Sequence, residues 1–208
     1  MEQGSLYIAS VAFIYAVWEN YAEDLAIELT SVISEHLDAS KVPDKVRALL
    51  ESATPWELSV HPGWQELWRT AVRARAKGDD ESTSFGMNTA NLSNVQSLLE
   101  LTGVSPVPTK IAAPGKKNDQ GATIEIPGTI SVDKNDMIDT KNLLKQLISV
   151  RGEAVHTART SSPLKKATIL WWNQMIVNLY IETDQRARRA ATALINGTPI
   201  TESIMTEP

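Results

Sequence analysis

A long helical period at the start of the chain most constrains what this sequence can fold into. Apolar side chains step by three or four residues between residues 5 and 37, and they are Val11, Ile14, Trp18, Tyr21, Leu25, Leu29 and Val32. That spacing matches the turn of an α-helix and predicts one buried face. At about 1.5 Å per residue such a helix is roughly 50 Å long. The sequence therefore predicts an all-α fold with one long N-terminal helix.

Further helices are predicted by the same period and by end signals along the chain. A second helix is expected to open at Ser40–Pro43, with Leu49 and Leu50 facing inward. The later predictions are a third helix from Trp64 to Gly78, a fourth from a capping-box pattern at Ser93–Gln96 to Gly103, a fifth over 134–157 and a sixth from Ser162–Pro163 to Asn196–Gly197. The sixth helix has apolar residues on more than one side, so we expect more than one of its faces to be buried.

The fourth and fifth predicted helices are separated by a long insertion of about residues 104–133. Its second part, Thr123–Val132, alternates around Pro127 and Gly128, which predicts a small β-hairpin. The 208 residues are 42% hydrophobic, enough for one sizeable core. We expect a single helical domain over residues 1–197, and a flexible tail over 198–208.

The composition excludes several classes of protein and site. No cysteine is present, so disulfides and thiolate metal sites are excluded, and the scattered acids form no recognisable set of metal ligands. No stretch reaches the roughly 18 apolar residues of a membrane span. The apolar N-terminal run lacks a basic flank and continues directly into Glu19, Glu23 and Asp24, unlike a signal peptide. The expectation is a cytoplasmic protein without metal, cofactor or membrane contact.

Charge is distributed unevenly along the chain. The net charge is −5, which argues against nucleic-acid binding by the whole surface. Residues 134–190 nevertheless contain ten Lys or Arg and five Asp or Glu, whereas residues 1–38 contain seven acids and no Lys or Arg. Two interpretations remain open: a true anion site in the basic part, or an acidic first helix and a basic last helix that lie together and neutralise each other.

The basic part contains Arg151 and His156 at the end of the fifth predicted helix. Five residues on a regular helix correspond to a rotation of about 140° between the two side chains. They can therefore converge on one ligand only if the helix loosens near its end, or if a second subunit supplies one of them. Gly152 is the natural place to loosen, because glycine costs a helix interior about 1 kcal/mol relative to alanine.

An Arg-x4-His pattern at the end of an apolar helix in an all-helical chain resembles the HEPN superfamily. More narrowly, the chain resembles the HEPN group associated with ribosomal L-PSP-type proteins, over about residues 5–195. The further segments that carry this resemblance are Val17–Tyr21 with its internal Glu19, Phe85–Asn88 and Asn94–Gly103. One departure is Gly152, where the family usually has a polar residue, often Asn or Asp.

The resemblance implies a HEPN-like helical bundle and a metal-independent endoribonuclease, with Arg151 and His156 as catalytic residues. Histidine transfers protons near neutral pH, and arginine holds phosphate oxygens in a fork. One His per chain cannot easily be both base and acid. HEPN nucleases resolve this with a composite site at a homodimer interface, which supplies two copies of each group. By analogy the resemblance also implies a toxin or antiviral defence role, with a cognate antitoxin or regulatory protein as a further partner besides RNA.

Other residues and functions remain candidates beside this scheme. Glu153 and Glu19 are auxiliary candidates, and Arg159, Lys165 and Lys166 are candidates for contacts with RNA phosphates. A purely structural alternative pairs Arg151 with Glu153 or with an acid of the first helix, and leaves His156 as a helix cap. The alternative functions are a catalytically inactive HEPN module that binds RNA or a protein, and a purely structural bundle.

Overall fold

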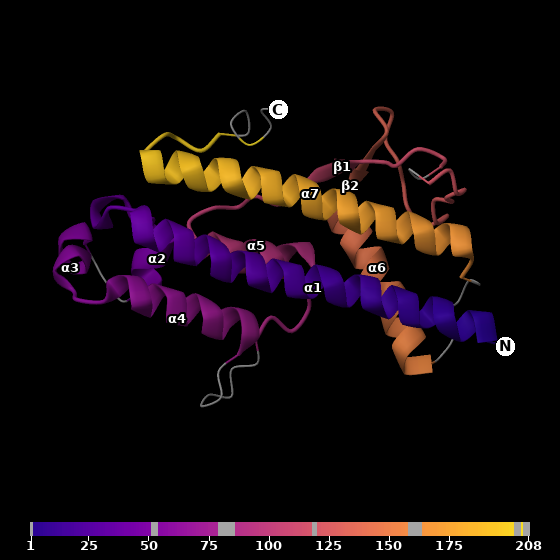
Figure 1. The fold of residues 1–208 in the computed structure, drawn as a ribbon, viewed down its shortest axis with the longest axis horizontal. Helices are drawn as coiled ribbons and strands as arrows, with labels where there is room; N and C mark the ends of the chain where they lie inside the picture. The colour runs from indigo at the N-terminus through magenta and orange to yellow at the C-terminus, as the bar shows by residue number, and fades with distance from the viewer. Residues whose placement is uncertain are drawn as a thin grey trace. The chain divides into compact units, whose positions relative to one another are not determined.

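The structure is a computed structural model that describes residues 2–50, 54–78, 86–117, 120–157, 164–201 and 205. Most of these residues are helical, and one small antiparallel sheet is present among them (Figure 1). In chain order the elements are α1 (Glu2–His36), η1 (Ala39–Lys41), α2 (Asp44–Leu49), α3 (Pro55–Val60), α4 (Trp64–Lys77), α5 (Leu92–Glu100), β1 (Lys110–Ala112), β2 (Met137–Asp139), α6 (Thr140–Thr157) and α7 (Lys166–Asn196). The predicted all-α class and the long first helix are confirmed.

Contacts between residues divide the chain into two compact units. Unit 1 consists of Met1–Asn20 and Pro108–Glu182, and unit 2 consists of Tyr21–Val107 and Thr183–Pro208. Both α1 and α7 cross this division, so each long helix contributes one segment to each unit. The single domain over 1–197 and the tail over 198–208 stay predictions. No helix in the described ranges combines the length and apolar character that a membrane crossing requires.

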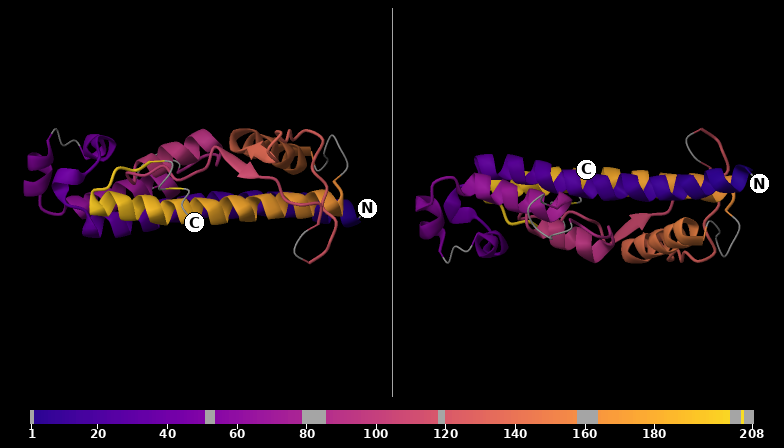
Figure 2. Two further views of the ribbon diagram at one scale, coloured as in Figure 1. Left: turned by 90° about the horizontal axis from the view of Figure 1, so that it is seen from above. Right: turned by 90° about the horizontal axis from the view of Figure 1, so that it is seen from below.

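Unit 1 is built from the first part of α1, the two strands, α6 and the first part of α7. Within it the segments of α1 and α7 run in the same direction side by side, and α6 lies to one side of them (Figures 1 and 2). Its largest fully buried side chains include Trp18, Trp171 and Trp172, together with leucines at 143, 144 and 147 of α6. The rings of Trp171 and Trp172 meet edge to face with centroids 4.9 Å apart. Burial of these aromatic and aliphatic groups fixes α6 in the unit.

Unit 2 contains the short helices and the remaining parts of α1 and α7. Trp68 of α4 is fully buried and donates its indole N–H to the carbonyl oxygen of Leu101, at 2.7 Å. Lys77 at the end of α4 pairs with Glu23 at 2.7 Å and with Asp24 at 3.1 Å, both on α1. Within unit 2, one cation of α4 therefore pairs with two acids of the first helix.

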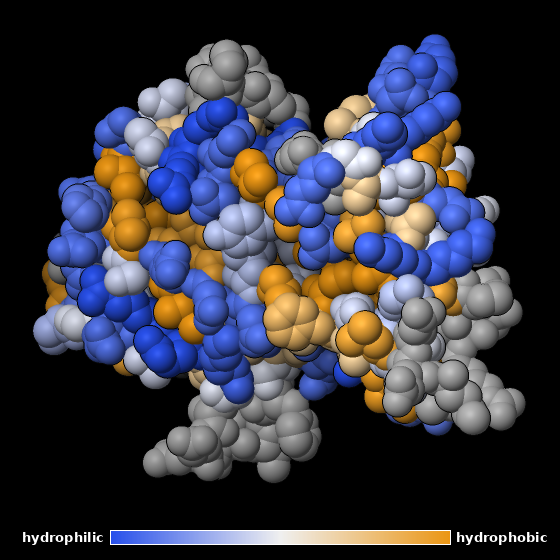
Figure 3. Space-filling view, turned by 45° about the vertical axis from the view of Figure 1, so that its right-hand side comes forward, coloured by the Kyte–Doolittle hydropathy of each residue, from blue (hydrophilic) through white to orange (hydrophobic). Residues whose placement is uncertain are grey.

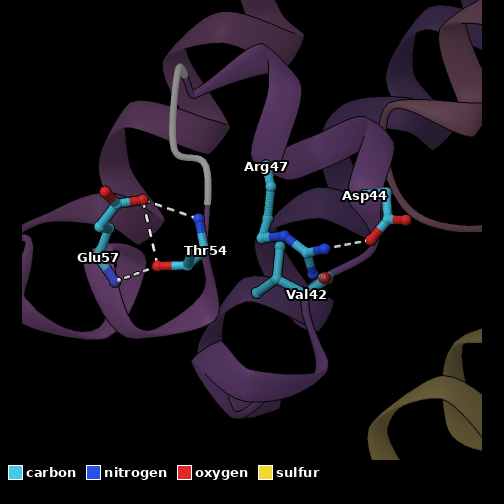
Figure 4. A network of polar contacts seen from close by, with 5 residues as sticks. All are labelled: Val42, Asp44, Arg47, Thr54 and Glu57. Atoms are coloured by element: carbon cyan, nitrogen blue, oxygen red, sulfur yellow. Dashed lines mark hydrogen bonds and ion pairs between the residues drawn. The ribbon is translucent and has the colours of Figure 1, made fainter.

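The segment predicted as one second helix consists of two short ones. Thr54 and Glu57 form a capping box that starts α3, while Arg47 of α2 contacts Asp44 and the carbonyl oxygen of Val42 (Figure 4). Pro55 at the first position of α3 suits a helix start. Leu50 at the C-cap of α2 is half-buried, and the side chain of Leu49 lies outside the described part of the structure.

Two further helix starts differ from the sequence predictions. The N-cap of α5 is Asn91, whose side chain accepts a hydrogen bond from the Asn94 amide at 2.9 Å, rather than the predicted box at Ser93–Gln96. Helix α6 begins at Thr140 instead of residue 134, because Asp136 has a φ of 56° and the next three residues form β2. A positive φ in a residue other than glycine does not continue an α-helix.

The predicted small antiparallel pair exists, but the position predicted at Thr123–Val132 is wrong. The strands are β1 and β2, with Ile111 opposite Ile138. Residues 123–132 lie in the connection between them and contribute only single bridges, Lys117 with Thr123 and Val132 with Ile138. Both central isoleucines are almost fully buried, so hydrophobic burial across a long connection selects this pairing over the local turn at Pro127–Gly128.

Candidate functional site

Arg151 lies in α6 and contacts an aromatic ring of α1. Its guanidinium carbon is 5.2 Å from the centroid of the Tyr15 ring, within the range of a cation–π interaction. Tyr15 is only 4% exposed, whereas Arg151 is half-buried. Among the described residues no ion pair joins Arg151 to Glu153 or to an acid of α1. The guanidinium thus lies against an aromatic ring of α1.

Tyr15 extends the contact to one of the predicted auxiliary residues. Its hydroxyl donates a hydrogen bond to Oε1 of Glu19 at 3.0 Å, one turn further along α1. Glu19 is half-buried. Arg151, Tyr15 and Glu19 therefore form one connected cluster in unit 1. Sequence reasoning missed Tyr15, although its spacing of four residues before Glu19 is a readable signal on a helix.

His156 lies in the last turn of α6 and is exposed. Its ring makes no hydrogen bond with any residue that the structure describes. A cation in the last helical turn is favoured by the helix dipole, yet this position also leaves both ring nitrogens available for proton transfer. Its role in chemistry stays a prediction.

The helix does not bring Arg151 and His156 together within one chain. Helix α6 continues through Gly152 to Thr157, so the first of the two alternatives, a helix that loosens near Gly152, does not occur in the described structure. Five residues of regular helix separate the two side chains by about 140° around the axis. One copy of the chain cannot direct both groups at one phosphate from this helix.

The remaining predicted residues lie around α6 and the start of α7. Glu153 is half-buried on α6, and Lys165 and Lys166 are exposed where α7 begins. Lys165 pairs with Glu125, with Nζ 3.1 Å from Oε1. Arg159 lies outside the described residues. Within the described ranges, no group of three or more His, Asp or Glu side chains is placed to hold a metal ion.

Comparison with known proteins now gives the family. Residues 2–187 match the model of the RiboL-PSP-HEPN family. Comparison with curated proteins and with solved structures yields no match. The family match extends over both units and over every described candidate residue, from Glu19 to Lys166. The chain therefore belongs to the RiboL-PSP-HEPN family.

Proposed function

We propose that this protein is a metal-independent endoribonuclease whose site combines Arg151 and His156 from two copies of the chain. The observation that carries the proposal is the position of the Arg151 guanidinium. Its guanidinium is positioned by the Tyr15 ring and, among the described residues, is not neutralised by a carboxylate. A positioned and uncompensated arginine presents a fork of N–H donors that fits phosphate oxygens.

The proposed reaction is attack of the ribose 2′-hydroxyl on the neighbouring phosphorus. His156 of one copy accepts the proton of the 2′-hydroxyl, and the 2′-oxygen forms a bond to phosphorus. The bond from phosphorus to the 5′-oxygen breaks, and His156 of the second copy donates a proton to that oxygen. Arg151 stabilises the charge that gathers on the phosphate oxygens in the transition state. The products are a 2′,3′-cyclic phosphate and a 5′-hydroxyl.

A homodimer is supported by the direction of the two side chains and by exposed apolar surface. The rotation of about 140° between Arg151 and His156 keeps them apart within a regular helix. Unit 1 also exposes large apolar side chains on each of its three helices, and apolar areas interrupt the hydrophilic surface in Figure 3. These side chains are Leu6, Phe13 and Val17 of α1, Val155 of α6, and Val177, Tyr180 and Ile181 of α7. Such surface on the elements of the site suits a protein interface.

Cleavage of RNA in the presence of EDTA tests the chemistry. Wild type should cut single-stranded or loop RNA and leave DNA of the same sequence intact, because DNA lacks the 2′-hydroxyl. His156→Ala should abolish cleavage, and Arg151→Ala should reduce the rate by about 10²–10³, the usual loss for a preorganised charge at a transition state. Arg151→Lys should recover only part of that loss. The exposed His36→Ala is the matched control and should be fully active.

Two results would contradict the proposal. Equal RNA degradation by wild type and by His156→Ala assigns the activity to a contaminant. If RNA cleavage requires magnesium, the proposed proton transfer by His156 is wrong. In either case the site has to be sought elsewhere.

A catalytically inactive module that binds RNA or a protein is the second candidate. The observation that favours it is Gly152, which stands directly after Arg151 where the family usually has a polar residue. RNA binding that depends on Arg151, without cleavage by wild type, would assign this function. For the active enzyme we propose a toxin or antiviral defence role in the cytoplasm, with a cognate antitoxin or regulatory protein as partner.

A further inference from the structure

A pocket of about 540 Å³ lies in unit 1, on a side of α6 that Arg151 does not occupy. Its walls are α6, the start of α7 and the connection at residues 125–129. The volume falls within the roughly 300–1,000 Å³ of pockets that hold small organic ligands. Glu153 of α6 lines this pocket, and His156 follows three residues later, so the two are neighbours on the helix surface. The pocket therefore lies on the His156 side of α6.

The wall formed by residues 125–129 is fixed in place by several contacts. The amide of Glu125 donates to the carbonyl oxygen of Ala167 at 3.2 Å, and its carboxylate pairs with Lys165. The amide of Ile130 closes a turn on the carbonyl oxygen of Pro127 at 2.9 Å. Ile124 and Ile130 are buried at either end of the wall. The pocket is thus bounded by a turn whose two ends are held by buried side chains, and at Glu125 also by a hydrogen bond and an ion pair.

Three polar side chains in the pocket have unused hydrogen-bonding capacity. Gln146 and Ser149 of α6 and Thr168 of α7 all line it. Their side chains form no hydrogen bond with any residue in the described ranges, and Gln146 and Thr168 are half-buried. An amide offers two donors and an acceptor, and each hydroxyl can donate and accept. A ligand that presents both donors and acceptors along one edge would satisfy them.

The charge and the apolar part of the lining restrict the ligand further. Among the described residues that line the pocket are two carboxylates, Glu125 and Glu153, and one ammonium group, that of Lys165, which is paired with Glu125. This balance disfavours a phosphate inside the pocket. Val150, Leu164 and the buried Trp172 supply apolar surface beside the polar groups. The lining suits a flat, uncharged heterocycle with a hydrogen-bonding edge.

We propose that this pocket binds a single unpaired nucleobase. Side-chain amides recognise base edges by paired hydrogen bonds, and apolar surface accepts the face of a base. The base can come from an RNA strand, a source that rests on the proposed function, or from a free nucleoside. If the base belongs to an RNA strand, the pocket selects the nucleotide next to the cleaved bond, because the pocket lies on the side of α6 that carries His156.

Binding of free nucleosides tests the pocket without any need for catalysis. Adenosine, guanosine, cytidine and uridine are titrated separately into the full chain in a calorimeter, with ribose 5-phosphate as the ligand control. At least one nucleoside should bind, and ribose 5-phosphate should not. Ser149→Trp fills the pocket and should weaken binding about tenfold or more, in line with the usual worth of one base contact. Asn142→Trp also introduces a tryptophan at an exposed position of α6, but one that does not line the pocket, and it should bind like wild type.

A second arm distinguishes the two sources of the base. The His156→Ala protein, with and without Ser149→Trp, is titrated with a short single-stranded RNA by fluorescence anisotropy. Weaker RNA binding on addition of Ser149→Trp assigns the base to the strand. Unchanged RNA binding, with nucleoside binding lost, assigns the pocket to a free nucleoside.

The proposal is overturned if no nucleoside binds, or if Ser149→Trp and Asn142→Trp bind nucleoside equally while both keep the wild-type melting temperature. These results are independent of the nuclease test. RNA cleavage without nucleoside binding would contradict only the proposal that the pocket binds a nucleobase. Nucleoside binding without RNA cleavage would contradict only the proposal of a nuclease.

Discussion

Two glycines of this chain, Gly152 and Gly86, differ in the space that a side chain would have. A Cβ at Gly152 would meet nothing within 4 Å, so this position has room for a side chain. A Cβ at Gly86 would lie 2.4 Å from the carbonyl oxygen of Ala76 and 2.7 Å from the amide nitrogen of Gly78, both backbone atoms at the end of α4. The glycine that follows Arg151 is therefore free to vary structurally, while the glycine beside α4 is required by close packing.

We predict that Gly152→Ala raises the free energy of unfolding by about 1 kcal/mol, because alanine is favoured over glycine inside a helix by that amount. Gly86→Ala should lower it by about 1–3 kcal/mol, the usual result of forcing atoms into a filled space. Urea unfolding of both variants and of wild type measures the two changes. Equal effects of the two substitutions would contradict the packing described for Gly86.

Tyr15 provides a second prediction at the level of one residue. Tyr15→Phe keeps the ring under Arg151 and removes the hydroxyl that donates to Glu19, so RNA cleavage should fall little. Tyr15→Leu removes the ring and should slow cleavage about tenfold, since a partly desolvated cation–π contact is worth roughly 1–2 kcal/mol. Cleavage rates are measured with melting temperatures as the control for folding. Equal rates for the two variants would mean that the ring does not position Arg151.

The spacing of Arg151 and His156 made both residues readable as candidates, but no sequence pattern could reveal that Tyr15 contacts Arg151. A contact between a cation and a ring joins residues far apart in the chain, and no local pattern encodes it. The nucleobase pocket was equally hidden, because Gln146, Ser149 and Thr168 become a group only when α6 and α7 pack around the 125–129 turn.

Among the elements, the short β1–β2 sheet depends on one carboxylate. Asp133 accepts hydrogen bonds from Lys110 at 2.8 Å and from the amides of Asn135 and Met137 at 2.9 and 3.0 Å. Hydrogen bonds from Lys110 and then from these amides lower the pKa of Asp133 to about 2. The charged carboxylate thus holds the turn that leads into β2.

This depressed pKa predicts a pH dependence of stability. The folded state favours ionised Asp133, so its contribution is present above the unfolded pKa of about 3.9 and is lost as the pH falls through about 2. Asp133→Asn should therefore be less stable than wild type at pH 5, and the difference should shrink between about pH 4 and pH 2. Melting temperatures across this range measure it. A difference that stays constant down to pH 2 would assign the effect to shape instead of charge.

Some helices and strands could be predicted from the sequence, and others could not. Helices with long apolar stripes, such as α1, were predicted within a few residues, because a period of 3.6 is a local property. The start of α6 was missed by six residues, since Asp133, Asp136 and β2 take their conformation from pairing with the distant β1. Val32 was placed in the buried stripe of α1 but is 49% exposed, and Ile33 is buried in its place. The stripe drifts around a helix of this length, so its end is harder to predict than its beginning.

At the level of the whole molecule, the composite site predicts a homodimer. Val155 precedes His156 and is 51% exposed, and Val32 in unit 2 is 49% exposed. Wild type should sediment with a mass near twice 22.8 kDa. Val155→Glu should shift the protein towards the monomer and reduce RNA cleavage, because a charge is costly in an apolar interface. Val32→Glu makes the same change at nearly the same exposure and should remain dimeric.

A clean monomer of wild type at micromolar concentration would contradict the composite site. A mixing experiment adds a functional readout: excess His156→Ala chains, equilibrated with a fixed amount of wild type, should lower its activity by forming mixed dimers. The Val155→Glu, His156→Ala double variant should not lower it.

The division of α1 between the two units has a consequence for synthesis on the ribosome. Residues 1–20 belong to unit 1, but their partners at 108–182 emerge only after all of Tyr21–Val107 has been made. At about 5–20 residues per second, this delay lasts on the order of ten seconds. During that time Val11, Ile14 and Trp18, which end up buried, have no part of α6 or α7 to cover them. The nascent chain therefore carries an uncovered apolar segment until residue 182 has left the exit tunnel, and its yield in the cell will depend on what shields that segment until then.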